Sequence, residues 1–86
     1  MDLTVVDATG NKTEEVTVPD DVASGRIVGR LVELMRLPKS GPDSQPLSYK
    51  FHHKQTGLQI NDNVTLRDAG VNDGDVLRLV AEITAG

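Results

Sequence analysis

The segment from Thr65 to the C-terminus constrains the fold more than any other part of this chain, because it specifies a capped turn followed by a strand. The hydroxyl of Thr65 can cap the amide of Asp68, and Gly70 can take the left-handed conformation that ends a short helical turn. A second turn follows at residues 72–74, and from there apolar residues alternate. One face of this predicted strand carries Leu77, Leu79 and Ala81, and the other carries Val76, Arg78, Val80 and Glu82. The segment therefore predicts a final strand that is buried on one face.

The N-terminal residues predict a β-hairpin. Apolar residues alternate from Leu3 to Asp7 and again from Lys12 to Val18, and the glycine-containing segment 8–11 between them is typical of a turn. The outer face of this hairpin is mostly polar, as expected when one face of a sheet packs against a core and the other meets water.

A single amphipathic helix is predicted after this hairpin. Ser24 is a candidate N-cap, and the periodic apolar residues continue to about Met35. Six apolar residues fall at helical spacing, namely Ile27, Val28, Leu31, Val32, Leu34 and Met35. This wide stripe is expected to face a sheet, with Leu31 buried together with Leu77 and Leu79. Gly25 and Gly29 are each expected to weaken the helix by about 1 kcal/mol relative to alanine.

A second hairpin is predicted after residue 46. Apolar residues at 47, 49 and 51 alternate with polar ones, segment 54–57 turns the chain, and residues 58–60 return as a short strand. The adjacent His52 and His53 are expected to point to opposite faces of the strand, so they are poorly placed to bind one metal ion. A polar hairpin edge is the favoured interpretation of this pair.

Composition argues against several classes of protein. The chain has 86 residues and no cysteine, which fits one compact domain and excludes disulfides, thiolate metal sites and a catalytic thiol within it. The net charge of −4 argues against nucleic-acid binding, and no apolar run has the length of a signal peptide or a membrane span. The serines lack a nucleophile motif, there is no phosphate-binding loop, and the acidic clusters lack the ligand spacing of a calcium loop. We therefore expect a cytoplasmic protein that is not an enzyme and carries no cofactor or metal.

Two motifs carry a resemblance to known families. Residues 65–86 resemble the C-terminal part of ubiquitin without a gap, through Thr65-Leu66-x-Asp68, Leu77-x-Leu79-Val80 and the terminal Gly86. The run from Leu66 to Leu77 is similar to the Leu-x-Asp-x-Gly-[Val or Ile]-x-x-Gly-Asp-x-Leu pattern of the small bacterial YukD-type proteins. The resemblance implies an α+β fold, a ubiquitin-like β-grasp with a mixed four- to five-stranded sheet packed on one α-helix. The elements predicted from the residues alone lead to the same architecture, since two hairpins and one helix bury a core only in this arrangement.

The resemblance implies two alternative functions. As a ubiquitin-like modifier, the chain would be adenylated at Gly86 by an E1-like activating enzyme and moved by an E2-like conjugating enzyme to an amine of a target protein, with a JAMM-type metalloprotease as a further partner. As a noncovalent interaction module, similar to YukD-type accessory proteins of type VII secretion, it would bind partners without using its tail. Neighbouring genes for conjugation enzymes would favour the first, and genes for a secretion ATPase or WXG-type substrates the second. In either case we expect a monomer when the chain is free, with no nucleic-acid or membrane partner.

Two candidate sites follow from the resemblance. Residues 82–86 are expected to extend from a domain of residues 1–81 as a flexible tail with Gly86 as the conjugated residue, and Ala85 stands where ubiquitin has a second glycine. The tail residues expected to contact an activating enzyme are Ala85, Thr84, Ile83 and Glu82. The expected partner surface, on a face of the sheet, consists of Ala8, Ser48, Lys50, Arg78 and Val80. Only Val80 is a sizeable apolar side chain in this set, so we expect polar, charge-dependent contacts.

Overall fold

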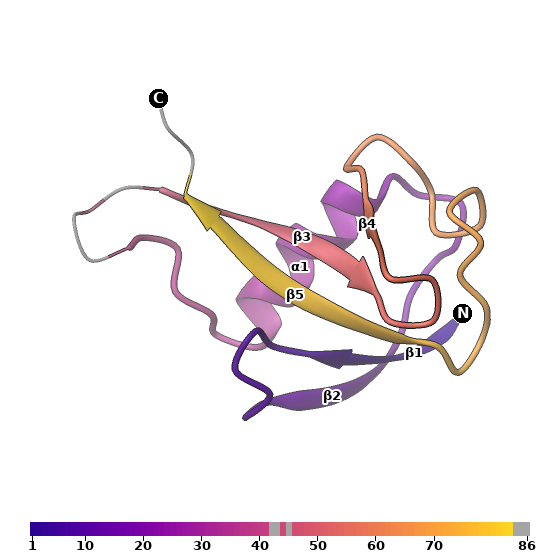
Figure 1. Cartoon of the computed structure of the whole chain (residues 1–86), viewed down its shortest axis with the longest axis horizontal. Helices are drawn as coiled ribbons and strands as arrows, with labels where there is room; N and C mark the ends of the chain where they lie inside the picture. The colour runs from indigo at the N-terminus through magenta and orange to yellow at the C-terminus, as the bar shows by residue number, and fades with distance from the viewer. Residues whose placement is uncertain (42–43, 45, 84–86) are drawn as a thin grey trace.

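A computed structural model describes residues 1–41, 44 and 46–83, and in this part of the chain one helix lies against a five-stranded mixed sheet (Figure 1). The strands are β1 (Asp2–Val6), β2 (Thr13–Thr17), β3 (Leu47–His53), β4 (Leu58–Ile60) and β5 (Val76–Ile83), and the helix is α1 (Ser24–Leu34). Their order across the sheet is β2-β1-β5-β3-β4, with β1 and β5 parallel and the other neighbours antiparallel. This is the predicted β-grasp architecture. No helix among the described residues is long and apolar enough to cross a membrane.

The core lies between α1 and the inner face of the sheet. Phe51, Leu66, Leu77 and Leu79 have no exposed surface, and Leu31 is 3% exposed in the same cluster. The predicted burial of Leu31 together with Leu77 and Leu79 is therefore confirmed. The alternation of apolar residues in β5 predicted their burial correctly because residues two apart on a strand share a face.

The turn that precedes β5 has the predicted chemistry. The Asp68 amide donates to Oγ1 of Thr65 at 3.1 Å, and Gly70 has a φ of +81°. The Val71 amide then donates to the carbonyl oxygen of Leu66 at 3.0 Å, and both of these side chains are buried. The turn therefore folds back on the core before the chain enters β5.

Two predictions for α1 are wrong. The N-cap is Ala23 rather than Ser24, because the Ser24 hydroxyl instead donates to the carbonyl oxygen of Val64 at 2.6 Å. Leu34 is 64% exposed, although the other five residues of the predicted stripe are buried. The stripe is wider than the surface that the sheet covers, so Leu34, at its margin, is left exposed.

Strand β5 is longer than predicted. The predicted domain ended at residue 81, but Glu82 pairs with Ser48 and Ile83 pairs with Leu47 in the antiparallel ladder of β3 and β5. Strand pairing depends on backbone hydrogen bonds and does not require buried side chains. The strand can therefore continue beyond the last apolar residue that faces the core. Glu82 and Ile83 therefore belong to the sheet rather than to a free tail, and residues 84–86 lie outside the described part of the chain.

Candidate partner-binding surface

The outer face of the sheet, on the side away from α1, carries most of the predicted partner surface. In the β3–β5 ladder, Lys50 lies opposite Val80, His52 opposite Arg78, and Ser48 opposite residue 82. Directly opposed residues of an antiparallel pair project to the same side. The structure therefore brings Ser48, Lys50, Arg78 and Val80 together on one surface, which we call the β3–β5 face.

Ala8 is the one residue of the predicted surface that lies outside the β3–β5 face. It is exposed in the turn between β1 and β2, two residues beyond Val6. Val6 itself lies opposite Arg78 in the parallel β1–β5 pair and is partly buried. Ala8 is thus placed by a turn rather than by the β3–β5 ladder, at the end of β1 that lies beside Arg78.

The charges of the β3–β5 face differ in how available they are to a partner. The Lys50 ammonium forms an ion pair with the Asp62 carboxylate, and the Lys50 side chain is only 23% exposed. Arg78 is exposed and forms no ion pair with another described residue. Val80 is 36% exposed. Arg78 can therefore pair with an anionic group of a partner, whereas Lys50 would first have to leave Asp62.

The predicted tail site divides into two parts. Glu82 and Ile83 lie in β5 and pair with β3. Thr84, Ala85 and Gly86 lie outside the described residues, so the conjugation role of Gly86 stays a prediction.

A buried polar cluster beside β3 was not predicted. His53 is 2% exposed, its Nε2 lies 2.8 Å from Oδ2 of Asp75, and its Nδ1 lies 3.0 Å from Oγ1 of Thr56. A hydrogen bond from the Asn72 amide, together with the one from His53, lowers the pKa of the Asp75 carboxyl below its ordinary value. The cluster joins the β3–β4 turn to the loop before β5. His52 is exposed on the outer face of β3, whereas His53 is buried, so the interpretation of the pair as a polar hairpin edge is wrong for His53.

Thr56, His53 and Asp75 are residue types of a hydrolytic triad, but their surroundings give them a structural role. Both ring nitrogens of His53 are engaged in joining the β3–β4 turn to the loop before β5, and none of the three residues lines either of the two grooves found on the described part of the chain. The described residues also contain no cluster of three or more His, Asp or Glu side chains that could hold a metal ion. The sequence did contain a signal for the burial of His53. Residues 47, 49 and 51 were predicted to face inward, and residue 53 is the next in that alternation.

Comparison with known proteins identifies the family. The family model described as "WXG100 protein secretion system (Wss), protein YukD" matches residues 1–79. The chain belongs to the YukD family. This YukD-family protein is also similar to a solved structure, Caldiarchaeum subterraneum ubiquitin, with 25% sequence identity and a TM-score of 0.72 over 100% of this chain and 98% of that chain. No curated protein matches it significantly in sequence.

These comparisons decide several of the predictions. They confirm the resemblance to YukD-type proteins and the ubiquitin-like β-grasp fold. Membership of a family of secretion-system proteins also agrees with the prediction that the chain is not an enzyme.

Proposed function

We propose that this YukD-family protein is a noncovalent binding module of a WXG100, or type VII, secretion system, and that it works in the cytoplasm. The observation that carries the proposal is the extent of the family match. Residues 1–79 include α1, the first four strands and half of β5, whereas residues 80–86 are not matched. The part that this chain has in common with the family is thus most of the folded domain, and the second half of β5 and the tail lie outside the match.

The β3–β5 face is the surface that we assign to this binding. Arg78 supplies a guanidinium that forms no ion pair with any described residue, and Val80 supplies a small apolar contact next to it. A charge-assisted hydrogen bond to Arg78 is stronger than a neutral one, and an exposed contact of this kind weakens as salt is added. The partner is therefore expected to present a carboxylate to the β3–β5 face.

Isothermal titration calorimetry with purified components of the WXG100 secretion system encoded beside this gene tests the proposal. Arg78→Glu should weaken binding by about tenfold or more, because it replaces an attraction by a repulsion. Arg36→Glu is the matched control, since Arg36 is also an exposed arginine but follows α1 on the other side of the molecule. It should leave the affinity within about twofold of wild type. The proposal is wrong if no component binds, or if both variants bind as tightly as wild type.

A second candidate function is that of a ubiquitin-like modifier, which the likeness to an archaeal ubiquitin over the whole chain favours. An E1-like enzyme would adenylate the Gly86 carboxylate with ATP, an E2-like enzyme would transfer it to a target amine, and a JAMM-type metalloprotease would act on the product. Mass spectrometry should detect an adenylate or thioester with the full chain and none with a chain that lacks Gly86. The modifier hypothesis fails if a verified active enzyme acts on neither chain, or on both equally.

A further inference from the structure

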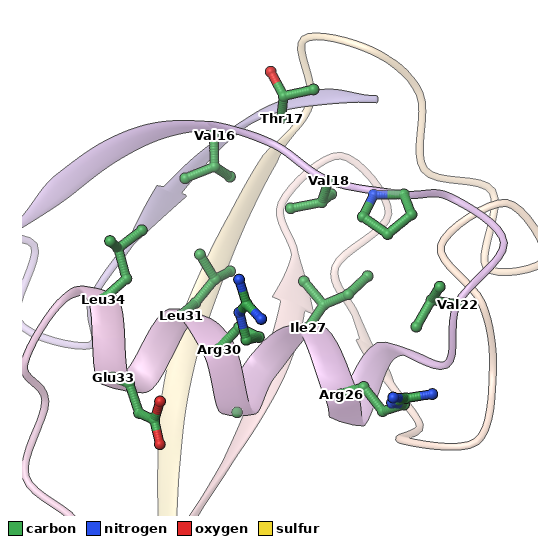
Figure 2. A pocket seen from close by; sticks show the side chains of 12 residues that line it. Val16, Thr17, Val18, Val22, Arg26, Ile27, Arg30, Leu31, Glu33 and Leu34 are labelled. Carbon is green, nitrogen blue, oxygen red and sulfur yellow. The ribbon is translucent and has the colours of Figure 1, made fainter.

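A groove runs between α1 and the edge strand β2, on the helix side of the sheet (Figure 2). Its volume is about 770 Å³. Half of its twelve lining residues are aliphatic, and they come from β2, from α1 and from the segment between them, namely Val16, Val18, Val22, Ile27, Leu31 and Leu34. We call it the α1–β2 groove. None of the residues that line it belongs to the β3–β5 face.

Strand β2 offers an open hydrogen-bonding edge along this groove. It stands at the end of the strand order and pairs only with β1, through residues 13–17. No backbone hydrogen bond from another described segment reaches its outer edge. Edge strands of this kind accept a further strand from another chain, and their main-chain groups then supply much of the affinity.

The described part of the chain leaves apolar surface along the groove uncovered. Leu34 is 64% exposed, and Val16 and Val18 are only partly buried. Figure 2 shows Leu31 and Leu34 extending from α1 toward β2, with Val16 across from them. Alternate side chains of a strand added to β2 would point into this space, because successive residues of a strand face opposite sides.

Two unpaired arginines stand on the helix side of the groove. Arg26 and Arg30 are exposed, line the groove, and form no ion pair with any described residue. Figure 2 shows the Arg30 side chain rising beside Leu31 toward β2. In a chain with a net charge of −4, this local positive charge favours an acidic ligand.

Acidic side chains lie toward the other end of the groove, near Leu34. Glu33 interacts with Lys39 at 3.7 Å, and in Figure 2 it points away from β2. Glu14 is exposed and precedes Val16 on the same face of β2, since it lies opposite Val5 in the β1–β2 ladder. Lys12, just before β2, donates from Nζ to the carbonyl oxygen of Met35 at 3.0 Å, so charges of both signs lie at this end. Arg26 and Arg30 are the charged residues that line the rest of the groove, and the acidic residues of a bound strand are therefore expected to lie beside them.

We infer that the α1–β2 groove binds an extended segment of a partner protein that pairs with β2, places alternate apolar side chains against Val16 and Leu31, and carries acidic residues beside Arg26 and Arg30. The inference rests on the proposed noncovalent role, but it uses a surface separate from the β3–β5 face, so each can fail alone.

The test is an NMR titration of the ¹⁵N-labelled full chain with a synthetic peptide of about ten residues, which alternates isoleucine and threonine and carries two glutamates at one end. Saturable amide shifts should concentrate in residues 13–18 and 26–34. A peptide with lysines in place of the glutamates should bind about tenfold more weakly, and Arg30→Glu should weaken the glutamate peptide by a similar factor. Of two peptides N-methylated on alternate sets of amides, only the one whose methyl groups face β2 should lose binding.

Arg78→Glu is the matched control for Arg30→Glu, because it changes an exposed arginine on the β3–β5 face and should leave the peptide affinity within about twofold. The inference is overturned if no saturable shifts appear at millimolar peptide, if Arg30→Glu binds like wild type, or if both N-methylated peptides still bind. The inference is also overturned if sedimentation shows that the wild-type chain forms a dimer and that Leu34→Asp dissociates it, because the groove would then be occupied by a second copy of the chain. None of these outcomes bears on the binding of a secretion component through Arg78, which the calorimetric experiment tests separately.

Discussion

Two glycines of α1 that look equivalent in the sequence should respond differently to alanine. A Cβ added at Gly29 meets no atom within 4 Å. A Cβ added at Gly25 lies 2.9 Å from Cβ of Asp62 and 3.4 Å from its carbonyl oxygen. The Gly25 amide donates to that same oxygen at 3.0 Å, so the neighbour cannot withdraw without straining this hydrogen bond.

The magnitudes follow from these contacts. Gly29→Ala removes only the helix penalty of glycine, so it should stabilise the fold by about 0.8–1.0 kcal/mol, or raise Tm by about 4–8 °C in a domain of this size. Gly25→Ala gains at most the same helix stabilisation. It must also displace Asp62, whose carboxylate forms the ion pair with Lys50. Overpacking of this kind costs about 1–3 kcal/mol, which leaves the variant between unchanged and about 2 kcal/mol less stable than wild type.

Differential scanning calorimetry and urea unfolding at neutral pH measure both variants against wild type. The two glycines act as controls for each other, because the substitution is the same and both lie in α1. If Gly25→Ala is stabilised as much as Gly29→Ala, the close approach of α1 to Asp62 is refuted. If Gly29→Ala is destabilised, the open position of Gly29 is refuted.

Three further predictions concern stability. Leu77→Ala should lower the free energy of unfolding by about 2–5 kcal/mol because Leu77 is completely buried, and a loss below about 0.5 kcal/mol in urea unfolding would contradict its place in the core. Thr65→Ala should cost about 0.5–2 kcal/mol by removing the 3.1 Å cap on Asp68, whereas an unchanged urea midpoint would mean that the cap contributes nothing. Asp75→Asn should cost about 1–3 kcal/mol at pH 7. Because the pKa of Asp75 is lowered from 3.8 by the Asn72 amide and His53, its carboxylate stabilises the fold above that pH and the contribution is lost as pH falls through the lower folded value. The difference from wild type should therefore shrink below about pH 4, and a difference that stays constant down to pH 2 would refute this role of the carboxylate.

The fold could be predicted because its signals are local and agree with one another. The cap of Thr65, the left-handed Gly70 and the alternation of Leu77 and Leu79 each depend on a few neighbouring residues. The residues of the β3–β5 face were predicted from the resemblance, while alternation fixes only which residues of one strand share a face, and the pairing of β3 with β5 brings the two sets together. The agreement of local turn, strand and helix signals is the property that makes a sequence specify one architecture.

The remaining features depend on contacts between distant segments. His53 is satisfied by Asp75, 22 residues away, and Lys50 by Asp62, in the loop after β4. The exposure of Leu34 depends on which strand ends the sheet, and the length of β5 depends on how far β3 runs beside it. Periodicity contains none of this information, so the α1–β2 groove could not be located before the strand order was known.

Removing residues 84–86 should separate the two proposed functions. The truncated chain keeps β5 to Ile83 and its pairing with β3, so its free energy of unfolding should change by no more than about 0.5 kcal/mol. Binding of a secretion component through Arg78 and Val80 should stay within about twofold of the full chain, because both residues lie in the part that is kept. A modifier would instead lose the Gly86 carboxylate, and with it any adenylate formed with an E1-like enzyme and ATP. If the truncation abolishes binding to the secretion component while the domain remains folded, the tail takes part in the noncovalent site, and the β3–β5 face alone does not account for recognition.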